Sequence, residues 1–383
     1  MAFGLYIHWP YCQSKCPYCD FNSHVATAIS TERWIAAYRH EIRRVADSCP
    51  DEILSTIFIG GGTPSLMDPR IVDAIISEAT SVWRTTNQLE ISMEANPGSV
   101  EIDRFRAYSL AGVNRVSLGI QSLNDEHLRL LGRLHGRTEA LKAIDVAQNV
   151  FARVNVDLIY ARQHQTIDAW SGELAEAIAL GTGHLSLYQL TIEDGTVFSK
   201  RHQAGLLHGL PREDTAVDMF ELTQSMCEAA GLPAYEVSNH ARPDQECRHN
   251  LIYWQGGRYA GIGPGAHGRL YQDGIRRATE AIRDPSAWLT AVETKGTGDL
   301  PDILLNSEDE VSEALLMGLR LTTGLDTSQR RSLQVDLDCW TSLNQMIDEG
   351  YLVRYGTVIR TTAPGRLLLN SVIGRLLQDI PQP

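Results

Sequence analysis

Short β-rich runs alternate with amphipathic helical segments through the first half of the chain. Runs of β-branched and aromatic residues that end in turn signals predict six strands, at residues 4–8, 56–59, 89–94, 115–120, 153–159 and 184–190. The first segment between them carries apolar residues at helical spacing, including Trp34, Tyr38 and Ile42. Regular alternation of strand and helix predicts a parallel sheet with helices packed outside it.

Polar residues near the strand ends distinguish a barrel from an open sheet. They follow five different strands: a cysteine cluster at 12–19, the run at 60–63, and then Glu94, Gln121 and Asp157. In a (β/α) barrel the carboxyl ends of all strands form one shared rim, whereas an open sheet collects its ligand groups at one switch point. We therefore predict an α/β fold built on a complete or partial (β/α) barrel.

The pattern changes after about residue 211. Helices are predicted at 212–230, 284–293, 308–319, near Thr327, 339–349 and 365–377, with two strands within 351–361. Three helices and a hairpin at the end of the chain predict a winged-helix-like α+β module. We expect a barrel at 1–240, a connecting region rich in glycine and aromatic residues at 241–303, and the C-terminal module at 304–383.

The charge balance argues against nucleic acid as a partner. The chain has 34 lysines and arginines against 47 acidic residues, a net charge of −13. The segment 308–383 has seven arginines, no lysine and ten acids, a net charge of −3. Nucleic-acid binding requires clustered positive charge, so the C-terminal module is interpreted as structural or as a protein contact.

Composition and cysteine usage indicate a soluble, cytoplasmic protein. Hydrophobic residues make up 43% of the chain, but no apolar run approaches the about 18 residues of a membrane-spanning helix. The first residues lack the layout of a secretion signal. Seven cysteines, an odd number, do not resemble the disulfide framework of a small secreted domain.

Three of those cysteines form a tight cluster. Cys12, Cys16 and Cys19 have the spacing C-x₃-C-x₂-C after the first predicted strand. Cysteine thiolates are the usual ligands of iron–sulfur clusters, and three of them leave one iron open to a small molecule. Zinc is the alternative, but structural zinc commonly uses two separated ligand pairs, and no second C-x₂-C exists in the chain.

Together with the motifs around it, the cysteine cluster resembles the radical S-adenosylmethionine (SAM) superfamily. The chain is most similar to the oxygen-independent coproporphyrinogen III oxidase family, from Tyr6 to about Arg375. The motifs that carry this resemblance are Tyr6-Ile-His-Trp-Pro-Tyr-Cys12, Gly60-Gly-Gly-Thr-Pro64, Glu94-Ala-Asn-Pro97, Gly119-Ile-Gln121-Ser and Asp157-Leu-Ile-Tyr160. The fold that it implies is the partial (β/α) barrel of radical SAM proteins.

The resemblance also implies two cofactors and their ligands. Cys12, Cys16 and Cys19 would bind three irons of a [4Fe–4S] cluster, and SAM would chelate the fourth iron. The residues that match the family's SAM sites are Tyr6, Tyr18, Gly61, Gly62, Thr63, Glu94, Gln121, Arg133 and Asp157. Carboxylates suit the ribose hydroxyls and the ammonium of SAM, and an arginine suits its carboxylate.

Two departures indicate the heme chaperone (HemW) branch of that family. The oxidase has a fourth cysteine where this chain has Phe21, and that cysteine is associated with oxidative decarboxylation. Conversely, His249-Asn250-Leu-Ile-Tyr253-Trp254 is similar to the H-N-x-x-Y-W motif of the chaperones. An imidazole can bind heme iron, and aromatic side chains offer flat apolar surface to the macrocycle. His249 is therefore a candidate heme ligand, although a histidine among aromatics is often only a packed core residue.

One loop departs from the family pattern. After Asp157-Leu-Ile-Tyr160 the family usually continues Gly-Leu-Pro-Gly-Gln, and this chain has Ala161-Arg162-Gln163-His164-Gln165. Loss of two glycines and a proline removes backbone freedom near the predicted SAM site. We expect SAM contacts to differ there, which puts productive cleavage of SAM in doubt.

Three functions remain open. The first is a heme chaperone on a radical SAM scaffold, with heme as cargo, acceptor hemoproteins (respiratory ones among them) as partners and a homodimer as a candidate assembly. The second is coproporphyrinogen III oxidase, which Phe21 disfavours. The third is a radical SAM enzyme that modifies RNA or protein, and the acidic tail argues against RNA. We predict the first.

Overall fold

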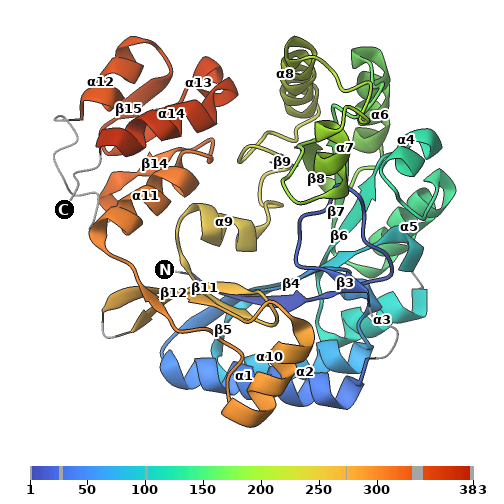
Figure 1. Cartoon of the computed structure of the whole chain (residues 1–383), viewed down its shortest axis with the longest axis vertical. Coiled ribbons are helices and arrows are strands. Elements are labelled where there is room, and N and C mark those ends of the chain that lie inside the picture. Colours follow the sequence, from blue (N-terminus) through green and yellow to red (C-terminus); the bar gives the residue numbers. More distant parts are fainter. Residues whose placement is uncertain (1, 26–28, 100–101, 273, 330–339, 380–383) are drawn as a thin grey trace.

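The architecture follows from a single large sheet. The computed structural model describes residues 2–25, 29–99, 102–272, 274–329 and 340–379. Its eleven-stranded sheet has the order β13-β12-β11-β10-β1-β4-β5-β6-β7-β8-β9. The sheet curves around the interior with helices on its outer side (Figure 1).

Six neighbouring strands of this sheet run parallel and appear in chain order. They are β1 (Phe3–Trp9), β4 (Ile53–Gly61), β5 (Arg84–Ala95), β6 (Arg115–Gln121), β7 (Arg153–Tyr160) and β8 (Gly183–Gln189). All six overlap the predicted strands. The connecting helices are α1 (Thr31–Ser48), α2 (Pro69–Val82), α3 (Ile102–Ala111), α4 (Asp125–Leu130), α5 (Arg137–Val150) and α6 (Ile167–Ala179). The partial barrel is thereby confirmed.

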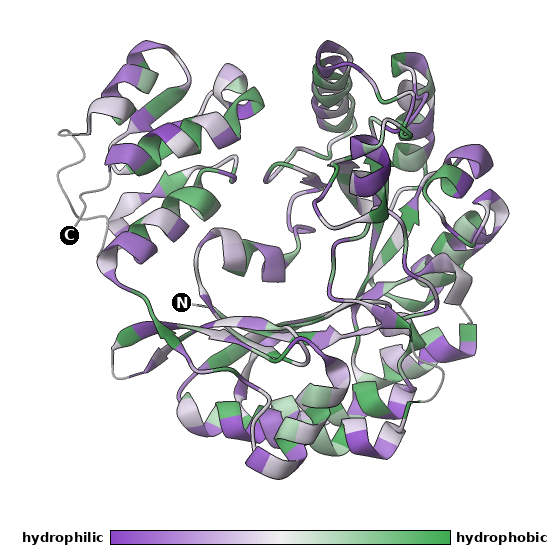
Figure 2. Cartoon of the chain, in the orientation of Figure 1, coloured by the Kyte–Doolittle hydropathy of each residue, from purple (hydrophilic) through white to green (hydrophobic). Residues whose placement is uncertain are grey.

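Local chemistry explains where these helices begin and which side they bury. The side chain of Asp68 accepts a hydrogen bond from the backbone N–H of Arg70, and Pro69 occupies the first turn of α2. On α1, Trp34 and Tyr38 are buried and pack against Trp288 of α10 (Pro285–Lys295). Figure 2 shows that the other outer helices are amphipathic too, since hydrophilic and hydrophobic residues alternate along each ribbon.

The predicted connecting region extends this sheet. β10 (Arg258–Ile262) pairs in parallel with β1, and β11 (His267–Gln272), β12 (Ile275–Glu280) and β13 (Ile303–Leu304) continue in antiparallel order. The glycines of the region permit the close pairing: a Cβ on Gly261 would lie 2.0 Å from the carbonyl oxygen of His267. These strands were not predicted from the sequence.

At the other edge of the sheet, β9 (Asn239–Ala241) pairs antiparallel with β8. Three further helices come between β8 and β10 along the chain: α7 (Val197–Gln203), α8 (Glu213–Ala229) and α9 (Arg248–Trp254). Short elements lie in the loops that follow the barrel strands: β2 (Tyr11–Cys12) and β3 (His24–Val25), which form a separate two-stranded sheet, η1 (Pro64–Leu66) and η2 (Pro97–Ser99).

The C-terminal module has its own core. It contains α11 (Ser307–Gly318), β14 (Leu325–Asp326), η3 (Thr327–Gln329), α12 (Thr341–Asp348), β15 (Leu352–Tyr355), β16 (Val358–Thr361), α13 (Ala363–Leu367), α14 (Leu369–Leu376) and η6 (Leu377–Asp379). Three strands in the order β14-β16-β15 and helices around a separate apolar cluster form the winged-helix-like arrangement.

Two details of this module differ from the prediction. The helix predicted at 365–377 is divided into α13 and α14, because Leu368 leaves helical geometry between them. The helix predicted near Thr327 is a single 3₁₀ turn. The predicted start of the helix at Cys339 lies outside the described residues. Across the described parts of the chain, every helix is too short or too polar to cross a bilayer.

Candidate functional site

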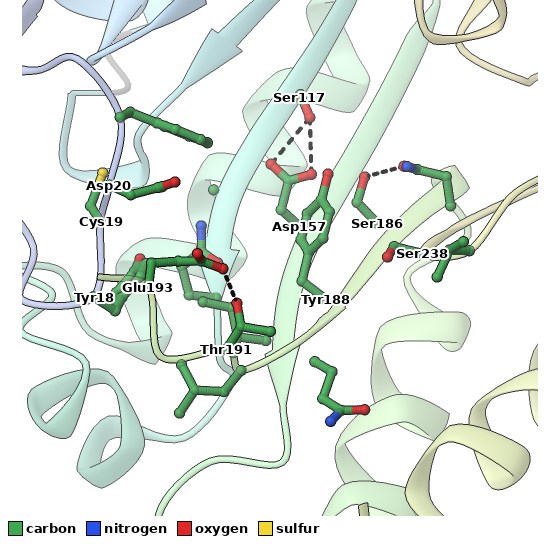
Figure 3. Close-up of a pocket in the computed structure, with 18 of the residues that line it drawn as sticks. Tyr18, Cys19, Asp20, Ser117, Asp157, Ser186, Tyr188, Thr191, Glu193 and Ser238 are labelled. Atoms are coloured by element: carbon green, nitrogen blue, oxygen red, sulfur yellow. Dashed lines mark hydrogen bonds between the residues drawn. The ribbon is translucent and has the colours of Figure 1, made fainter. Parts of the chain in front are cut away.

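A cavity of about 1,320 Å³ opens at the carboxyl ends of the barrel strands. The cysteine loop, the strand ends, α8, α9 and the C-terminal module all contribute to its lining. A typical single-ligand pocket has a volume of roughly 300–1,000 Å³, so this cavity is large enough for more than one small molecule. Figure 3 shows part of it, with Cys19, Asp157 and Ser186 on different segments around one space.

The structure brings every predicted site residue to this cavity. The lining includes Tyr6, Cys12, Cys16, Tyr18, Cys19, Gly61, Gly62, Thr63, Glu94, Gln121, Arg133, Asp157 and His249. Convergence of residues from eight separate stretches of the chain is the geometric outcome that the barrel prediction required. The ligand that each residue would bind stays a prediction.

The cysteine loop offers three free thiols of intermediate exposure. The hydroxyl of Thr63 donates to Cys12 Sγ at 3.3 Å, and the guanidinium of Arg133 donates to Cys16 Sγ at 3.5 Å. Burial raises the pKa of the Cys12 and Cys19 thiols, so a bound metal would have to supply the charge that stabilises their thiolates. Donors aimed at sulfur fit an anionic cluster, which such hydrogen bonds stabilise.

The arrangement differs from a site for one metal ion. Within the described ranges, no group of three or more His, Cys, Asp or Glu side chains is placed around a single ion. In a [4Fe–4S] cluster each cysteine thiolate binds a different iron. The ligand atoms therefore need not converge on one point, and three cysteines spread along one loop are compatible with such a cluster.

Two glycines bring backbone close to the cysteine loop. A Cβ on Gly62 would lie 2.7 Å from the carbonyl oxygen of Tyr11 and 3.1 Å from Cys12 Sγ. Gly61 has a φ of +115°, which favours glycine, and its N–H donates to Glu94 Oε2 at 3.0 Å. The turn after β4 thus leaves its backbone open to a ligand beside the cysteines.

Two partly buried carboxyls, Glu94 of β5 and Asp157 of β7, line the same cavity. Burial and the nearby Asp157 raise the pKa of Glu94 to about 8. Burial also raises the pKa of Asp157, whose two carboxyl oxygens each accept from the hydroxyl of Ser117 at 3.1 Å. A cationic group or a set of hydroxyls between these carboxyls would reduce the cost of ionising them. This is the chemistry of an amino acid ammonium and a ribose.

Arg133 and Gln121 line the same cavity. The guanidinium of Arg133 also donates to the carbonyl oxygen of Gly119 at 2.8 Å, while its buried Nε has no hydrogen-bond partner in the described residues. Gln121 ends β6 with a φ of +68°, a conformation that non-glycine residues seldom adopt. The guanidinium of Arg133 is therefore placed to reach a carboxylate beside Cys16.

His249 is fully buried, with 0% exposure, on α9. One ring nitrogen, Nδ1, is 2.7 Å from the hydroxyl of Thr56, and the other, Nε2, is 2.7 Å from the hydroxyl of Tyr253. Burial lowers the pKa of His249 to about 3, so the ring is neutral, as a metal ligand must be. To bind heme iron, His249 would have to exchange one of these hydroxyl partners for the metal.

Sequence reasoning missed several polar residues of the cavity. Alternate residues of β6 line it, which adds Arg115 and Ser117, while β7 adds Asn155 and β8 adds Ser186. Asn155 Nδ2 donates to Asp157 Oδ1 at 2.6 Å and to the hydroxyl of Ser186 at 2.8 Å. Polar residues at alternate positions of otherwise apolar strands were the available signal, because alternate side chains share one face.

The loop that departs from the family pattern keeps a glycine-like backbone. Ala161 and His164 occupy the two glycine positions, and their φ angles are +56° and +60°. Two non-glycine residues are therefore held in left-handed conformations in this loop. His164 is tied down by its N–H, which donates to the carbonyl oxygen of Gly209 at 2.6 Å.

Known families match both halves of the molecule. The profile of the radical SAM superfamily matches residues 6–171, and that of the HemN C-terminal domain matches residues 305–368. The chain is 36% identical to the heme chaperone HemW of Escherichia coli (strain K12), over 98% of each protein. It is 34% identical to the HemW of Haemophilus influenzae, again over 98% of each.

Two further comparisons extend this picture. The mitochondrial "Radical S-adenosyl methionine domain-containing protein 1" of Danio rerio is 32% identical over 98% of this chain and 87% of its own length. Among solved structures, the coproporphyrinogen III oxidase HemN of Escherichia coli superposes with a TM-score of 0.81 at 21% identity. That superposition covers 98% of this chain and 89% of HemN, and it establishes a shared fold.

Proposed function

The chain belongs to the HemW family of the radical SAM superfamily, and from this premise we propose that it binds heme and transfers it to acceptor hemoproteins. The observation that carries the proposal is the shared cavity, which joins the cysteine loop to α9 with its H-N-x-x-Y-W motif. A heme chaperone needs a site that holds its cargo and remains open for release.

Phe21 separates this proposal from the oxidase. Its side chain is 58% exposed and lines the cavity where the oxidase has its fourth cysteine. A phenyl ring can contact a macrocycle but cannot carry out thiol chemistry. An anaerobic assay for decarboxylation of coproporphyrinogen tests the difference, and turnover would overturn the chaperone proposal as stated.

The proposal assigns a [4Fe–4S] cluster to Cys12, Cys16 and Cys19. Support comes from their free thiols at the cavity and from the donors of Thr63 and Arg133. When bound, such a cluster supplies one-electron redox chemistry. The chain's own contribution is to present three thiolates, keep the adjacent backbone at Gly62 clear of side chains, and place a cation beside the sulfurs.

The proposal assigns SAM to the adjacent part of the cavity. Glu94 and Asp157 would bind the ammonium and the ribose hydroxyls, while Arg133 and Gln121 would lie near the carboxylate. The remaining contacts would come from Tyr6, Tyr18, Gly61, Gly62 and Thr63. This assignment is supported by the two partly buried carboxyls, whose raised pKa values a cation would lower.

Iron and sulfide content tests the cluster. We expect anaerobically purified protein to contain about four irons and four sulfides per chain, and the triple variant C12A/C16A/C19A to contain neither. The control is Cys49→Ala, a cysteine of the α1 end that does not line the cavity. Zinc in place of iron, or equal iron in the triple variant, would overturn the assignment.

A hemin titration followed by absorbance tests the role of His249. If His249 is the axial ligand, His249→Ala abolishes the spectral shift, and Tyr253→Phe retains or strengthens binding because it frees Nε2 from its hydroxyl partner. The matched control is His240→Ala, which alters a histidine that is also buried but lies outside the cavity lining. Unchanged spectra in the His249 variant would remove that residue from the heme site.

The partners and the location complete the proposal. Acceptors would be hemoproteins, with respiratory ones the first to test, and a homodimer is the assembly to examine. The cytoplasm is the proposed location, because reducing conditions keep the three thiols available for a cluster. Transfer of heme to an apo-hemoprotein, followed by absorbance, is the assay for the complete function.

A further inference from the structure

We propose that Arg320 and Arg366 bind the carboxylates of the tetrapyrrole, so that the C-terminal module supplies the anion-binding end of the cargo site. This inference rests on the proposed heme function and adds residues and an orientation to it. Both arginines line the cavity although they belong to the C-terminal module.

The charge of the cavity lining differs from that of the module as a whole. The module's lining residues are Arg320, Arg366, Leu367, Leu368, Leu369, Asn370 and Ser371, which include two cations and no acid. Residues 308–383 nevertheless carry a net charge of −3. Positive charge is therefore concentrated at the cavity side of an acidic module. The acidic side chains Glu94 and Asp157 line the barrel end of the same cavity.

Neither arginine has a carboxylate within ion-pair distance in the described residues. The guanidinium of Arg366 donates to the carbonyl oxygen of Arg320 at 3.1 Å, and its buried Nε has no partner there. The nearest acidic influence on Arg366 is Glu236, whose Oε1 accepts hydrogen bonds from Asn239 and from the backbone N–H of Ser238. A partly buried cation without a paired anion is costly, and an anionic ligand removes that cost.

Other arginines in this part of the molecule have partners. Arg375 pairs with Glu349, and Arg269 and Arg276 both pair with Glu313 of α11. Arg360 lies over the ring of Tyr355, away from the cavity. The guanidinium groups of Arg320 and Arg366, which have no carboxylate partner in the described residues, thus both line the cavity.

Arg320 also connects the module to the heme motif. Its guanidinium lies 6.0 Å from the ring centroid of Trp254, the last residue of H-N-x-x-Y-W. Its other contact is a long hydrogen bond of 3.4 Å to Asn370. A carboxylate that approached Arg320 would therefore lie next to α9, the helix that carries the heme motif.

The apolar surface beside the arginines fits the rest of such a ligand. Leu367 and Leu368 are 38% and 47% exposed and follow Arg366 directly. Across the cavity, Val217 and Phe220 of α8 also contribute to the lining. A flat apolar ring with two carboxylates on one edge matches two arginines next to exposed leucines.

A comparison of two probes tests the inference. Hemin has free propionates, and hemin dimethyl ester has the same ring without the negative charges. We expect the wild-type chain to bind hemin at least about tenfold more tightly than the ester, since a charge-assisted hydrogen bond contributes at least that factor. In Arg320→Gln and Arg366→Gln this ratio should fall by about tenfold each, with ester affinity unchanged.

Control variants separate the possible failures. Arg360→Gln should keep the wild-type ratio, and His249→Ala should weaken both probes equally. Arg366→Lys retains the charge and should retain part of the preference, so it serves if Arg366→Gln does not fold. No binding of either probe by the wild-type chain would overturn the heme function itself. Binding with the same ratio in the Arg320→Gln and Arg366→Gln variants would overturn only this inference.

Discussion

At the residue scale, the electrostatics of the cavity depend on a few buried groups. Glu94 has no cation as a direct partner in the described residues and accepts only a backbone N–H from Gly61. Asp157, by contrast, accepts from the hydroxyl of Ser117 on both carboxyl oxygens and from the amide of Asn155 on Oδ1. Glu94 is therefore the acid that gains most when a cationic ligand enters.

This predicts a pH-dependent stability for the ligand-free protein. The pKa of Glu94 is raised from its ordinary 4.5 to about 8, so the folded chain keeps a proton that the unfolded chain releases. The free energy of unfolding should therefore decrease as pH rises from about 5 to about 8, and then level off. Urea unfolding at several pH values should show a flatter dependence in Glu94→Gln. The exposed substitution Glu228→Gln on α8 should show the pH dependence of the wild type. A pH dependence of Glu94→Gln that runs parallel to that of the wild type would contradict the prediction.

At the element scale, the loop after β7 shows which contacts hold a backbone that contains left-handed non-glycine residues. Arg162 is 2% exposed and forms a buried ion pair with Glu173 of α6, and it also donates to the carbonyl oxygen of Gln121 at 3.2 Å. Glu173 in turn accepts from the hydroxyl of Ser122 and the N–H of Leu123. These contacts hold the loop, the end of β6 and α6 together where glycines and a proline are absent.

The left-handed residue at position 161 gives a test of that strain. Ala161→Gly should change the free energy of unfolding by less than about 0.5 kcal/mol. Glycine removes the strain of a φ of +56°, and this gain offsets the conformational entropy that glycine adds to the unfolded chain. Ala143→Gly in the middle of α5, also buried, should cost at least about 1 kcal/mol. Equal losses in the two variants, measured by urea unfolding, would show that Ala161 is unstrained.

The ion pair predicts strong coupling between two side chains. Arg162→Leu alone should destabilise the fold by about 3–5 kcal/mol, since it leaves the carboxylate of Glu173 buried without its cation. Arg162→Leu with Glu173→Gln should recover part of that loss. A double-mutant cycle in urea gives the coupling energy, and additive effects would contradict the role assigned to the pair.

At the scale of the whole molecule, the cavity is built by segments far apart in the chain. The cysteine loop lies near residue 16, α9 near 250 and the arginines of the C-terminal module at 320 and 366. Figure 1 shows the module beside α9, across from α8. A ligand in this cavity would therefore contact the barrel and the module at once.

Hydrogen exchange can detect that simultaneous contact. Addition of hemin should slow amide exchange both in α9 and in the segment from Leu367 to Ser371, because both line the cavity. The outer helix α2 should not change and serves as the internal reference. Protection of α9 with none in the module would indicate that heme contacts the barrel alone.

The sequence by itself determined the elements and the chemistry that depend on short stretches. The six parallel strands, the C-x₃-C-x₂-C loop and the glycine turn at 60–63 are local patterns, since hydrophobic period and turn residues act over a few positions. Strand order then followed, because neighbouring βα units pack side by side. Residues such as Glu94 and Asp157 could be predicted at the rim for the same reason.

Only the tertiary structure decided which distant groups share a surface. The pairing of β10 with β1, the hydroxyl of Thr56 on His249 across 193 residues, and the entry of Arg320 and Arg366 into the cavity are long-range contacts. No local pattern encodes them, because they depend on how complete elements pack and on which polar groups remain unpaired after packing. The cysteine motif can therefore be predicted from local sequence, whereas the groups that surround it are brought together only by the tertiary structure.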